Sequence, residues 1–526
     1  MEYYKDLREW IKALEESNNL VRIRREINKD TELMPLVRWQ YRGLPENERK
    51  AFIFENIVDA KGKRYTMPVI TACYAGTRKI YALGMMCSPD KIMETWSAAQ
   101  ANPIEPKLIG EGPVHEEIHV GDNLLEHEGL GEIPVPISTP GFDNGPYLTA
   151  PCWLSKDPET GVTNIGTYRT QIKSSTRVGI FCQQPQHMRE HWQKCKDKGL
   201  KALQAAIILG PTPNIAYCSV AKIPFGTSEI AVAGGLAGQP VELVKCKTVD
   251  LEVPATAEIV IEGEIPTDYL EREGPFGEHT GYISGEFFNL YMNITCISHR
   301  KQPIYAGFIS QFPPSESSVI RGVGADAITF NHLRYECNIP TVLDVHWHQE
   351  SGSNQFCAIK IKKTNDAQPW QALLSASAYT PKNGKNIIVV DEDIDIHDVD
   401  ALLWALCYRV QPDRDIKIVP GKLHITDPSV APDIEGRSER VPGCSLLINA
   451  TRKWPYPPTA LPAKEFMEKA KAIWEEEKLP ALTPKAPWYG YELGRWTQRN
   501  KSEAEMALRG DHYKIGEEAT LKRKKV

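Results

Sequence analysis

The stretch Ala257-Glu-Ile-Val-Ile-Glu-Gly263 is the best starting point for the fold, because β-branched residues fill its centre and such residues are enriched in strands. A similar stretch, residues 290–298, follows after a segment rich in Gly and Pro. Two more strands are predicted at residues 177–182 and 215–221, and one helix at residues 186–198. Many short strands with few helices predict a sheet that is closed or split into a barrel.

On the N-terminal side of this region, helix and strand signals are mixed. The first helix is amphipathic, and the apolar residues on its one face are Leu7, Trp10, Ile11 and Leu14. Strands are predicted at residues 21–24, 51–54 and 68–71, and a helix at 93–101. We therefore expect an α/β domain over residues 1–125. Residues 108–140, rich in Gly, Pro, Glu and His, are expected to be linker and irregular structure.

On the C-terminal side, helix and strand alternate again. The predicted elements are strands at residues 340–346 and 386–391 and helices at residues 399–409 and 464–477. We expect an α/β domain over residues 321–460, after the strand-rich domain of residues 126–320, and a helical tail over residues 461–526. The fold class is therefore α+β.

The composition is that of an ordinary globular protein, with 41% hydrophobic and 25% charged residues in 526. A formal net charge of −6 predicts no general attraction to nucleic acid or to an anionic membrane, and the basic run at residues 522–525 is expected to be a solvated tail. We find no signal peptide and no apolar stretch near the ~18 residues of a membrane span. The twelve cysteines form no C-x-x-C pair, so we expect reduced thiols in a cytoplasmic enzyme.

The densest potential chemistry lies in the segment Glu271-Arg-Glu-Gly-Pro-Phe-Gly-Glu-His-Thr-Gly281. It combines three carboxylates, an arginine and a histidine with Gly and Pro residues that a solvated charge run would not need. Rigid turns can hold two carboxylates at a fixed separation. Their mutual repulsion and partial burial would raise the pKa of one of them and supply a proton donor near neutral pH. An acidic surface loop is the alternative interpretation.

Two further segments carry polar groups in suggestive positions. In a regular strand Asn164 and Arg169 would face opposite sides, unless a bulge at Gly166 intervenes; a polar edge strand is the alternative. His187 and His191 are four residues apart on a predicted helix, as paired metal ligands can be. The sequence lacks the H-E-x-x-H motif of zinc peptidases, and ordinary surface histidines are the alternative.

A glycine-rich segment surrounds Glu229. Gly226-Thr-Ser-Glu229 and the following Ala233-Gly-Gly-Leu can approach a phosphate through backbone N–H groups. The chain has neither the G-x-G-x-x-G pattern of a Rossmann fold nor the G-K-[ST] ending of a P-loop. A plain turn between strands is the alternative.

Taken together, these segments resemble the UbiD family of decarboxylases, whose signature is similar to Glu273-Gly-Pro-Phe-Gly-Glu278. The other segments that match in order and spacing are Asn164-x-Gly-x-x-Arg169, Pro185-Gln-His187, Glu229, residues 244–246, 251–260, 390–395 and 404–405, Arg409 and residues 411–415. The resemblance covers most of residues 5–455. In one place the chain departs from the family pattern, because Asn449 stands where an aspartate is often found.

The resemblance implies a central split β-barrel that binds a flavin, over residues 126–320, and a C-terminal oligomerisation domain over residues 321–460. It also implies that Asn164, His187 and Glu229 bind a divalent metal, Mn²⁺ or Mg²⁺, with K⁺ as an additional candidate cation. A mixed set of nitrogen and oxygen donors suits these metals better than a thiolate-selected one.

The cofactor implied by the resemblance is prenylated FMN, with its phosphate bridged by the metal and with Thr167 and Gln186 as further contacts. Arg169, Glu273 and Glu278 are the implied catalytic residues. Arg169 would hold the substrate carboxylate and keep Glu273 ionised, and Glu278 would act as the general acid. The implied reaction is the reversible, non-oxidative decarboxylation of an aromatic or other α,β-unsaturated acid, or of an aryl-CoA ester with a free carboxylate, through a covalent adduct with the cofactor.

The implied partners are a flavin prenyltransferase that supplies the cofactor and further copies of the chain in a dimer or hexamer. Two other functions stay open: a metal-dependent hydrolase that uses His187, His191 and Glu229, and a non-catalytic cofactor-binding subunit of a multi-subunit carboxylase. The substrate is not determined. Residues 344–350 could line an aromatic pocket or finish a strand, and the tail with residues 487–491 and Trp496 could cover the site or an interface.

Overall fold

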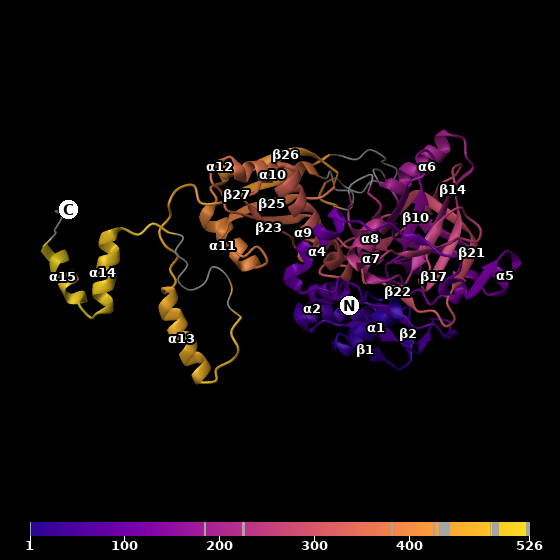
Figure 1. Ribbon diagram of the computed structural model, residues 1–526, viewed down its shortest axis with the longest axis horizontal. Coiled ribbons are helices and arrows are strands. Elements are labelled where there is room, and N and C mark those ends of the chain that lie inside the picture. Colours follow the sequence, from indigo (N-terminus) through magenta and orange to yellow (C-terminus); the bar gives the residue numbers. More distant parts are fainter. Residues whose placement is uncertain are drawn as a thin grey trace.

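The computed structural model describes residues 2–183, 186–223, 227–379, 382–423, 427–430, 442–483, 485 and 494–521. Figure 1 shows an N-terminal region packed beside a strand-rich central region, with a C-terminal sheet on the far side of helix α9 (Glu316–Asn331). The helices of the tail extend away from the rest of the chain in this view. The α+β class predicted from the sequence is confirmed.

The N-terminal region is built on a four-stranded sheet. Its strand order is β1 (Leu20–Ile23), β3 (Ala51–Phe54), β6 (Val69–Thr71), β22 (Tyr305–Gly307). The last of these strands comes from far along the chain, after the whole central region, and pairs in parallel with β6. A smaller sheet and four helices complete this part: β2 (Ile27–Asn28), β4 (Ile57–Val58), β5 (Arg64–Tyr65), α1 (Leu7–Glu16), α2 (Leu33–Gly43), α3 (Arg78–Gly84) and α4 (Ile92–Ala101).

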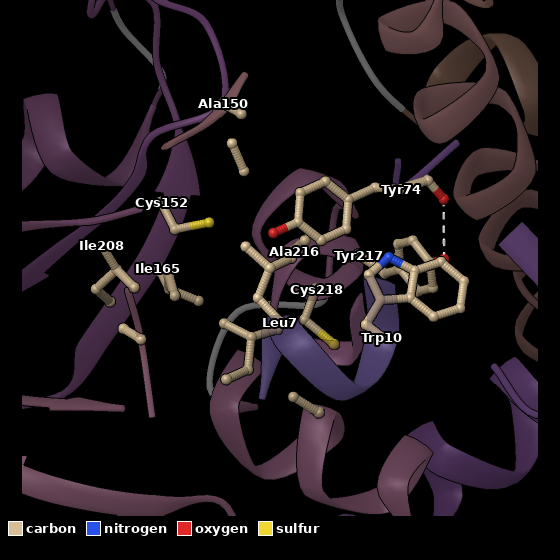
Figure 2. Packing of buried hydrophobic residues seen from close by; sticks show 14 of the residues in the cluster. Leu7, Trp10, Tyr74, Ala150, Cys152, Ile165, Ile208, Ala216, Tyr217 and Cys218 are labelled. Carbon is tan, nitrogen blue, oxygen red and sulfur yellow. Dashed lines mark hydrogen bonds between the residues drawn. The ribbon is translucent and has the colours of Figure 1, made fainter. Parts of the chain in front are cut away.

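Helix α1 shows how the sequence pattern becomes packing. Asp6 caps its N-terminus by accepting hydrogen bonds from the backbone of Arg8 and Glu9, and the predicted apolar face, from Leu7 to Leu14, is buried. Figure 2 shows Leu7 and Trp10 of this helix among residues of helix α7 (Pro213–Val220) and of the central strands. There the Tyr217 hydroxyl donates to the carbonyl of Tyr74 at 2.9 Å. The N-terminal region thus shares one core with the central sheet.

The central region is an antiparallel sheet of ten strands. Its main path runs β11 (Thr163–Thr167), β10 (Cys152–Lys156), β14 (Ala202–Leu209), β17 (Ile259–Pro266), β21 (Phe287–His299), β13 (Arg177–Ile180), β12 (Thr170–Ser174), β9 (Tyr147–Leu148). Strands β8 (Glu117–Val120) and β18 (Glu271–Glu273) also pair with β21. Within the described residues no ladder joins β11 to β9, so the split barrel stays a prediction.

Several predicted elements are confirmed here, and others differ from the prediction. The strands at 177–182, 257–263 and 290–298 are present, and the helix at 186–198 is α6 (His187–Asp197). Residues 215–221, expected as a strand, form α7 instead. Pro213 suits the first turn of a helix, and burial of nearly the whole segment removes the periodicity that would reveal one. Residues 108–140 are largely irregular, as expected, but they also contribute β8 and the short helix α5 (Asp122–Glu126).

Small elements around the central sheet hold the glycine-rich segment and the acidic loop. Residues 233–236, expected in a loop, lie within helix α8 (Glu229–Ala237), where Gly234 and Gly235 give room for close contacts with the backbone of residues 99–104. The remaining strands are β7 (Lys107–Leu108), β15 (Glu242–Lys245), β16 (Glu252–Pro254), β19 (Phe276–Gly277) and β20 (Ile283–Ser284).

The C-terminal region is a five-stranded mixed sheet with order β23 (Val342–Trp347), β24 (Phe356–Ile361), β25 (Asn386–Asp391), β27 (Gly443–Ala450), β26 (Ile416–Lys422). Its helices are α10 (Gln368–Tyr379), α11 (Val399–Arg409) and α12 (Pro412–Asp415). The predicted strand at 386–391 and helix at 399–409 have the predicted bounds, and the strand expected at 340–346 is β23.

The tail contains helices α13 (Lys464–Glu476), α14 (Gln498–Leu508) and α15 (His512–Leu521), and none of them buries a residue. The basic run at residues 522–525 and the aromatic segment at 487–491 lie outside the described residues. In the part of the chain that the structure describes, no helix combines the length and apolar character needed to span a bilayer.

Candidate active site

Arg169 is the centre of a buried cluster of charges. It lies just after β11, and its guanidinium donates to both carboxylate oxygens of Glu273, from Nε at 2.9 Å and from Nη2 at 2.7 Å. Nη1 donates to Glu278 and, at 2.9 Å, to the hydroxyl of Ser284. The rings of Phe181 and Phe276 lie 4.0 and 5.2 Å from the guanidinium. The predicted trio of Arg169, Glu273 and Glu278 is therefore brought together, in a bidentate geometry that fixes the arginine.

The loop that carries the two glutamates is held from outside. Asp143 accepts from the backbone N–H of Gly277 at 2.8 Å, and Asn144 donates to the carbonyl of Gly274 at 2.6 Å. Gly274 has φ +101°, and a Cβ there would lie 2.5 Å from the carbonyl oxygen of Gly285, so only glycine fits. The alternative of a solvated acidic loop is wrong, because Glu273 is fully buried and Glu278 is 8% exposed.

One prediction about this loop has the wrong sign. We expected repulsion between two carboxylates to raise the pKa of one of them. Burial does act to raise the pKa of Glu278, but the charge of Arg169 and the contact with His279 outweigh it and lower the pKa to about 2. The reason is that Arg169 lies between the two acids, so each of them meets a cation rather than the other anion.

His279 links this cluster to the C-terminal region. Its Nδ1 lies 3.2 Å from Glu278, and its Nε2 lies 2.6 Å from the side-chain nitrogen of Asn354. Arg321, in α9, adds a second positive charge near Glu278. Sequence reasoning missed Asn354, Arg321 and Ser284, since each comes from a segment whose pattern indicates only a turn, a helix or a strand end.

Asn164, His187 and Glu229 form a second cluster. Asn164 lies in β11 and His187 is the first residue of α6; Asn164 Oδ1 and His187 Nδ1 are 2.8 Å apart. Glu229 is the first residue of α8 and is hydrogen-bonded to the backbone of Ile165. Glu229 is 8% exposed, and burial raises its pKa to about 7. A buried carboxyl without a basic partner is costly, and a cation would remove that cost.

The bulge that Gly166 would permit does not occur, because β10 and β11 pair in regular register through that residue. Gly166 instead gives room to the ring of Tyr168, whose hydroxyl would be 2.6 Å from a Cβ there. The chain leaves the ladder only after Thr167, at Tyr168 and Arg169. About five extended residues span at most ~17 Å, so the Arg169 cluster and the Asn164 cluster are near neighbours.

The other predicted contacts are placed as follows. Thr167 hydrogen-bonds to Ser219 of α7 at 2.9 Å, and Gln186 accepts from the backbone of Gln183 at 2.7 Å. His191 is buried and lies 3.0 Å from the hydroxyl of Ser155; burial lowers the pKa of His191 to about 4. This second histidine of α6 is thus engaged in the core, as a structural histidine would be.

The segment at residues 344–350 is also engaged internally. His346 and the backbone of Trp347 contact Asp326 of α9, at 3.0 and 2.7 Å, and His348 contacts the carbonyl of Ile396 at 2.9 Å. These contacts favour the interpretation that the segment finishes strand β23. Trp496, in the tail, is 47% exposed.

A group of basic residues that the sequence did not reveal lies around Lys222. Lys222 is exposed on the surface, but many protein atoms lie around it and displace part of its hydration. This partial desolvation, together with repulsion from Lys382, Arg321 and Lys422, lowers its pKa to about 7. Lys422 is buried, and burial lowers its pKa to about 8. Four cations that repel one another favour an anion in their midst.

Comparison with known proteins identifies the class. Models of the three domains of 3-octaprenyl-4-hydroxybenzoate carboxy-lyase match this chain: the N-terminal domain over residues 11–100, the Rift-related domain over 108–312 and the C-terminal domain over 319–450. These matches cover most of the chain, so the protein has the domain set of a carboxy-lyase. It belongs to the UbiD family.

Relatives and solved structures agree with this assignment. An uncharacterised protein of Aquifex aeolicus is 32% identical over 475 residues, which is 86% of this chain and 92% of the relative. The evolved dimeric form of the UbiD-class enzyme HmfF from Pelotomaculum thermopropionicum, in complex with prFMN, is 30% identical; the match has a TM-score of 0.76 and covers 89% of this chain and 100% of that one. The apo 3,4-dihydroxybenzoic acid decarboxylase of Enterobacter cloacae is 25% identical, with a TM-score of 0.74 and coverage of 92% and 98%. Fold and family are therefore those of UbiD-class decarboxylases.

Proposed function

We propose that this protein catalyses the reversible, non-oxidative decarboxylation of an aromatic or other α,β-unsaturated carboxylic acid, with prenylated FMN as its cofactor. The observation that carries the proposal is the buried Arg169, held in bidentate fashion by Glu273 and bound on its other side to Glu278. Such a cluster offers a cation for a substrate carboxylate and a carboxyl for proton transfer within one enclosed site.

Two features support a flavin phosphate and a metal. Glu229 is a buried acid that needs a cation, and it lies with Asn164 and His187 in a set of nitrogen and oxygen donors that suits Mn²⁺ or Mg²⁺, with K⁺ as a further cation. Asn164 Oδ1 and His187 Nδ1 are 2.8 Å apart, close to the ~3 Å between neighbouring ligands of an octahedral ion bound at ~2.1 Å. The cations around Lys222 repel one another, so the binding of an anionic phosphate among them would be favourable.

Prenylated FMN, when bound, supplies the electron sink that loss of CO₂ from an sp² carbon requires and that no side chain provides. In our proposal the residues Asn164, His187 and Glu229 hold its metal, and Thr167 and Gln186 are further contacts. The Lys222 group adds positive charge for the phosphate. The phosphate thus needs no P-loop.

The chain's own residues bind the substrate and deliver a proton. Arg169 Nη1 now contacts Glu278, and a substrate carboxylate would compete for the same N–H groups while Glu273 keeps the guanidinium in place. A bound carboxylate would take up part of the positive charge of Arg169, so one of the influences that lower the pKa of Glu278 would weaken while burial continues to raise it. A protonated Glu278 can then give its proton to the carbon that has lost CO₂, so the bond to the carboxylate is replaced by a bond to hydrogen.

The finer parts of the proposal follow the same family pattern. The substrate class rests on relatives such as the vanillic acid decarboxylase of Sedimentibacter hydroxybenzoicus, 25% identical with a TM-score of 0.74. We also propose that the chain is divided into an N-terminal α/β domain (residues 1–125), a split β-barrel (126–320), a C-terminal α/β domain (321–460) and a helical tail (461–526). We further propose that the protein forms a homo-oligomer. The exposed apolar residues of the unpacked tail helices, such as Ile473 and Leu508, support association with further copies.

The test is to co-express the chain with a flavin prenyltransferase and to measure the absorption spectrum, the mass of the released cofactor and the exchange of labelled CO₂ into aromatic acids. We expect bound prenylated FMN and exchange that depends on it. A colourless protein that hydrolyses esters or amides with metal alone would favour the hydrolase. Bound cofactor without exchange for any acid tested would favour the non-catalytic subunit.

A further inference from the structure

Three side chains of the central region converge at the end of β21 opposite to the catalytic loop. They are His119 of β8, Glu132 at the end of the short 3₁₀ helix Gly129–Glu132, and His299, the last residue of β21. Their ligand atoms all lie within 4.8 Å of one another. His119 pairs opposite Ile297 in the antiparallel ladder, so its side chain is on the same face as that of His299.

The geometry of this group is that of metal ligands rather than of a hydrogen-bond network. Glu132 lies 3.5 Å from His119 Nδ1 through one oxygen and 3.5 Å from His299 Nε2 through the other, beyond good hydrogen-bond length. Ligands of a tetrahedral zinc ion, bound at ~2.0–2.1 Å, are ~3.3 Å apart. The observed spacing therefore leaves room for an ion between the carboxylate and the two rings.

His299 is oriented for such a role. Its Nδ1 lies 2.8 Å from the carbonyl oxygen of Arg300, so this nitrogen carries the proton and Nε2 carries the lone pair. Nε2 is buried, has no hydrogen-bond partner among the residues that the structure describes, and lies 3.5 Å from Glu132. The residue is 5% exposed, and His119, equally buried, stacks on the ring of His127 at 3.9 Å. Fixing one imidazole nitrogen by a backbone carbonyl is how proteins commonly prepare the other for a metal.

We propose that His119, Glu132 and His299 bind a zinc ion, with water as the fourth ligand. Two imidazoles and one carboxylate are a known zinc set, and they come here from three separate elements. The ion would fasten residues 117–132 to the end of β21, and Figure 1 shows α5 of that segment at the outer edge of the molecule beside β21.

The zinc site would be distinct from the proposed cofactor metal. It shares no ligand with the set Asn164, His187 and Glu229. Glu273 pairs with Phe287 at one end of β21 and His299 closes the other, so the catalytic loop and the zinc site lie at opposite ends of this strand, which is at most ~40 Å long at ~3.3 Å per residue. The site is therefore expected to affect stability rather than turnover, and it does not depend on the proposed function.

The competing state is an ion pair without metal. Burial opposes the charge on His299, but Glu132 and the Arg300 carbonyl raise its pKa; burial likewise opposes the charge on Glu132, but His299 and His119 lower its pKa. A protonated His299 could thus satisfy Glu132 by itself. The two states differ in metal content, which can be measured.

The experiment uses the full chain with His187→Ala, which removes an imidazole from the proposed cofactor-metal site. After chelation, the protein is titrated with Co²⁺ and the visible spectrum is recorded, because tetrahedral Co²⁺ absorbs far more strongly than octahedral Co²⁺. We expect one tetrahedral Co²⁺ per chain, displaced by Zn²⁺. The signal should be lost on adding Glu132→Gln and kept on adding Glu126→Gln, an exposed glutamate of the neighbouring α5.

Two results would overturn the proposal: no tetrahedral Co²⁺ signal in the His187→Ala protein, or a signal that persists with Glu132→Gln. Glu132→Gln is nearly isosteric, and circular dichroism shows whether it has folded. Should it fail to fold, the spectrum of the His187→Ala protein decides by itself, since the ion-pair state gives no signal there.

Discussion

The Arg169 cluster and the Asn164 cluster lie at the two ends of one short stretch of chain, yet they balance their charges differently. Around Arg169 every charge has a partner in the protein, with Glu273 and Glu278 on one guanidinium. Around Asn164, no basic side chain among the described residues lowers the pKa of the buried Glu229. Lys222 donates to Asn383 at 3.4 Å and is repelled by Lys382, Arg321 and Lys422. The first cluster is complete before any ligand arrives, whereas the second is left in need of charges that a resident cofactor can supply.

This difference separates residues that would exchange partners with a substrate during each turnover from residues that would stay bound to a cofactor. A substrate comes and goes, so the residues that meet it must be stable without it, and Arg169 keeps both glutamates satisfied in the meantime. A tightly held cofactor can remain, so its site can leave charges unpaired at the expense of the empty protein's stability.

The largest effect is expected for Glu278→Gln. Removal of the proposed general acid should lower turnover by about 10²–10⁴-fold while the cofactor stays bound, because such proton transfer contributes that much. The measurement is kcat together with the absorption spectrum of the bound flavin. The control is Glu286→Gln on the same loop, whose side chain is 44% exposed and forms an ion pair with Arg272. Equal activity of the two variants would remove the role of Glu278.

The next effect concerns the stability of the empty protein. Arg169→Met leaves Glu273 and Glu278 buried without their cation, so we expect a loss of about 3–5 kcal/mol in the free energy of unfolding. Arg177→Met, which breaks an exposed pair with Glu271, should cost at most ~1 kcal/mol. Denaturant unfolding of both variants measures the difference. Similar losses would contradict the view that the Arg169 cluster is internally balanced.

A smaller effect should appear in acid. Because the pKa of Glu278 is lower in the folded chain than in the unfolded one, its ionised form stabilises the fold above about pH 4.5, and this contribution is lost as the pH falls toward about 2. We expect the wild type to exceed Glu278→Gln by about 2–3 kcal/mol at pH 6, and the gap to close toward pH 2. Unfolding curves at several pH values check this, and a gap independent of pH would contradict it.

The smallest effect is expected at Lys222, and it has the opposite direction. Its pKa is lower in the folded chain than in the unfolded one, so the unfolded state binds more protons between about pH 7 and 10.5, and stability rises with pH across that window. Lys222→Met should remove this rise and weaken the binding of inorganic phosphate to the cofactor-free protein. Thermal unfolding between pH 6.5 and 9, with and without phosphate, is the measurement. A rise that survives in the variant would count against Lys222 as its source.

The elements predicted most accurately from the sequence have a clear hydrophobic pattern and clear boundary residues. Helix α11 and strand β25 were predicted to the residue, because turn-forming or charged residues border each apolar run. Helix α7 was missed because burial of nearly the whole helix leaves no polar face to give it a period.

For the site, the motifs gave the identities of Arg169, Glu273 and Glu278, but not the sign of the pKa shift of Glu278. The direction of the shift depends on whether the arginine lies between the two acids, and no spacing along the chain specifies this. Lys222 and Arg321 gave no signal at all, since a single basic residue in an ordinary segment resembles any surface charge.

The position of strand β22 in the sequence affects how the protein folds during its synthesis on the ribosome. The N-terminal sheet lacks its last strand until Tyr305–Gly307 has been synthesised, although its first three strands end at Thr71. Until then the edge of β6, with Val69 and Ile70 that are fully buried in the finished protein, is open to pairing with other nascent chains. A fragment cut at residue 125 would remain in that condition permanently, so we expect it to aggregate when expressed alone, whereas one extended through Gly307 should stay in solution.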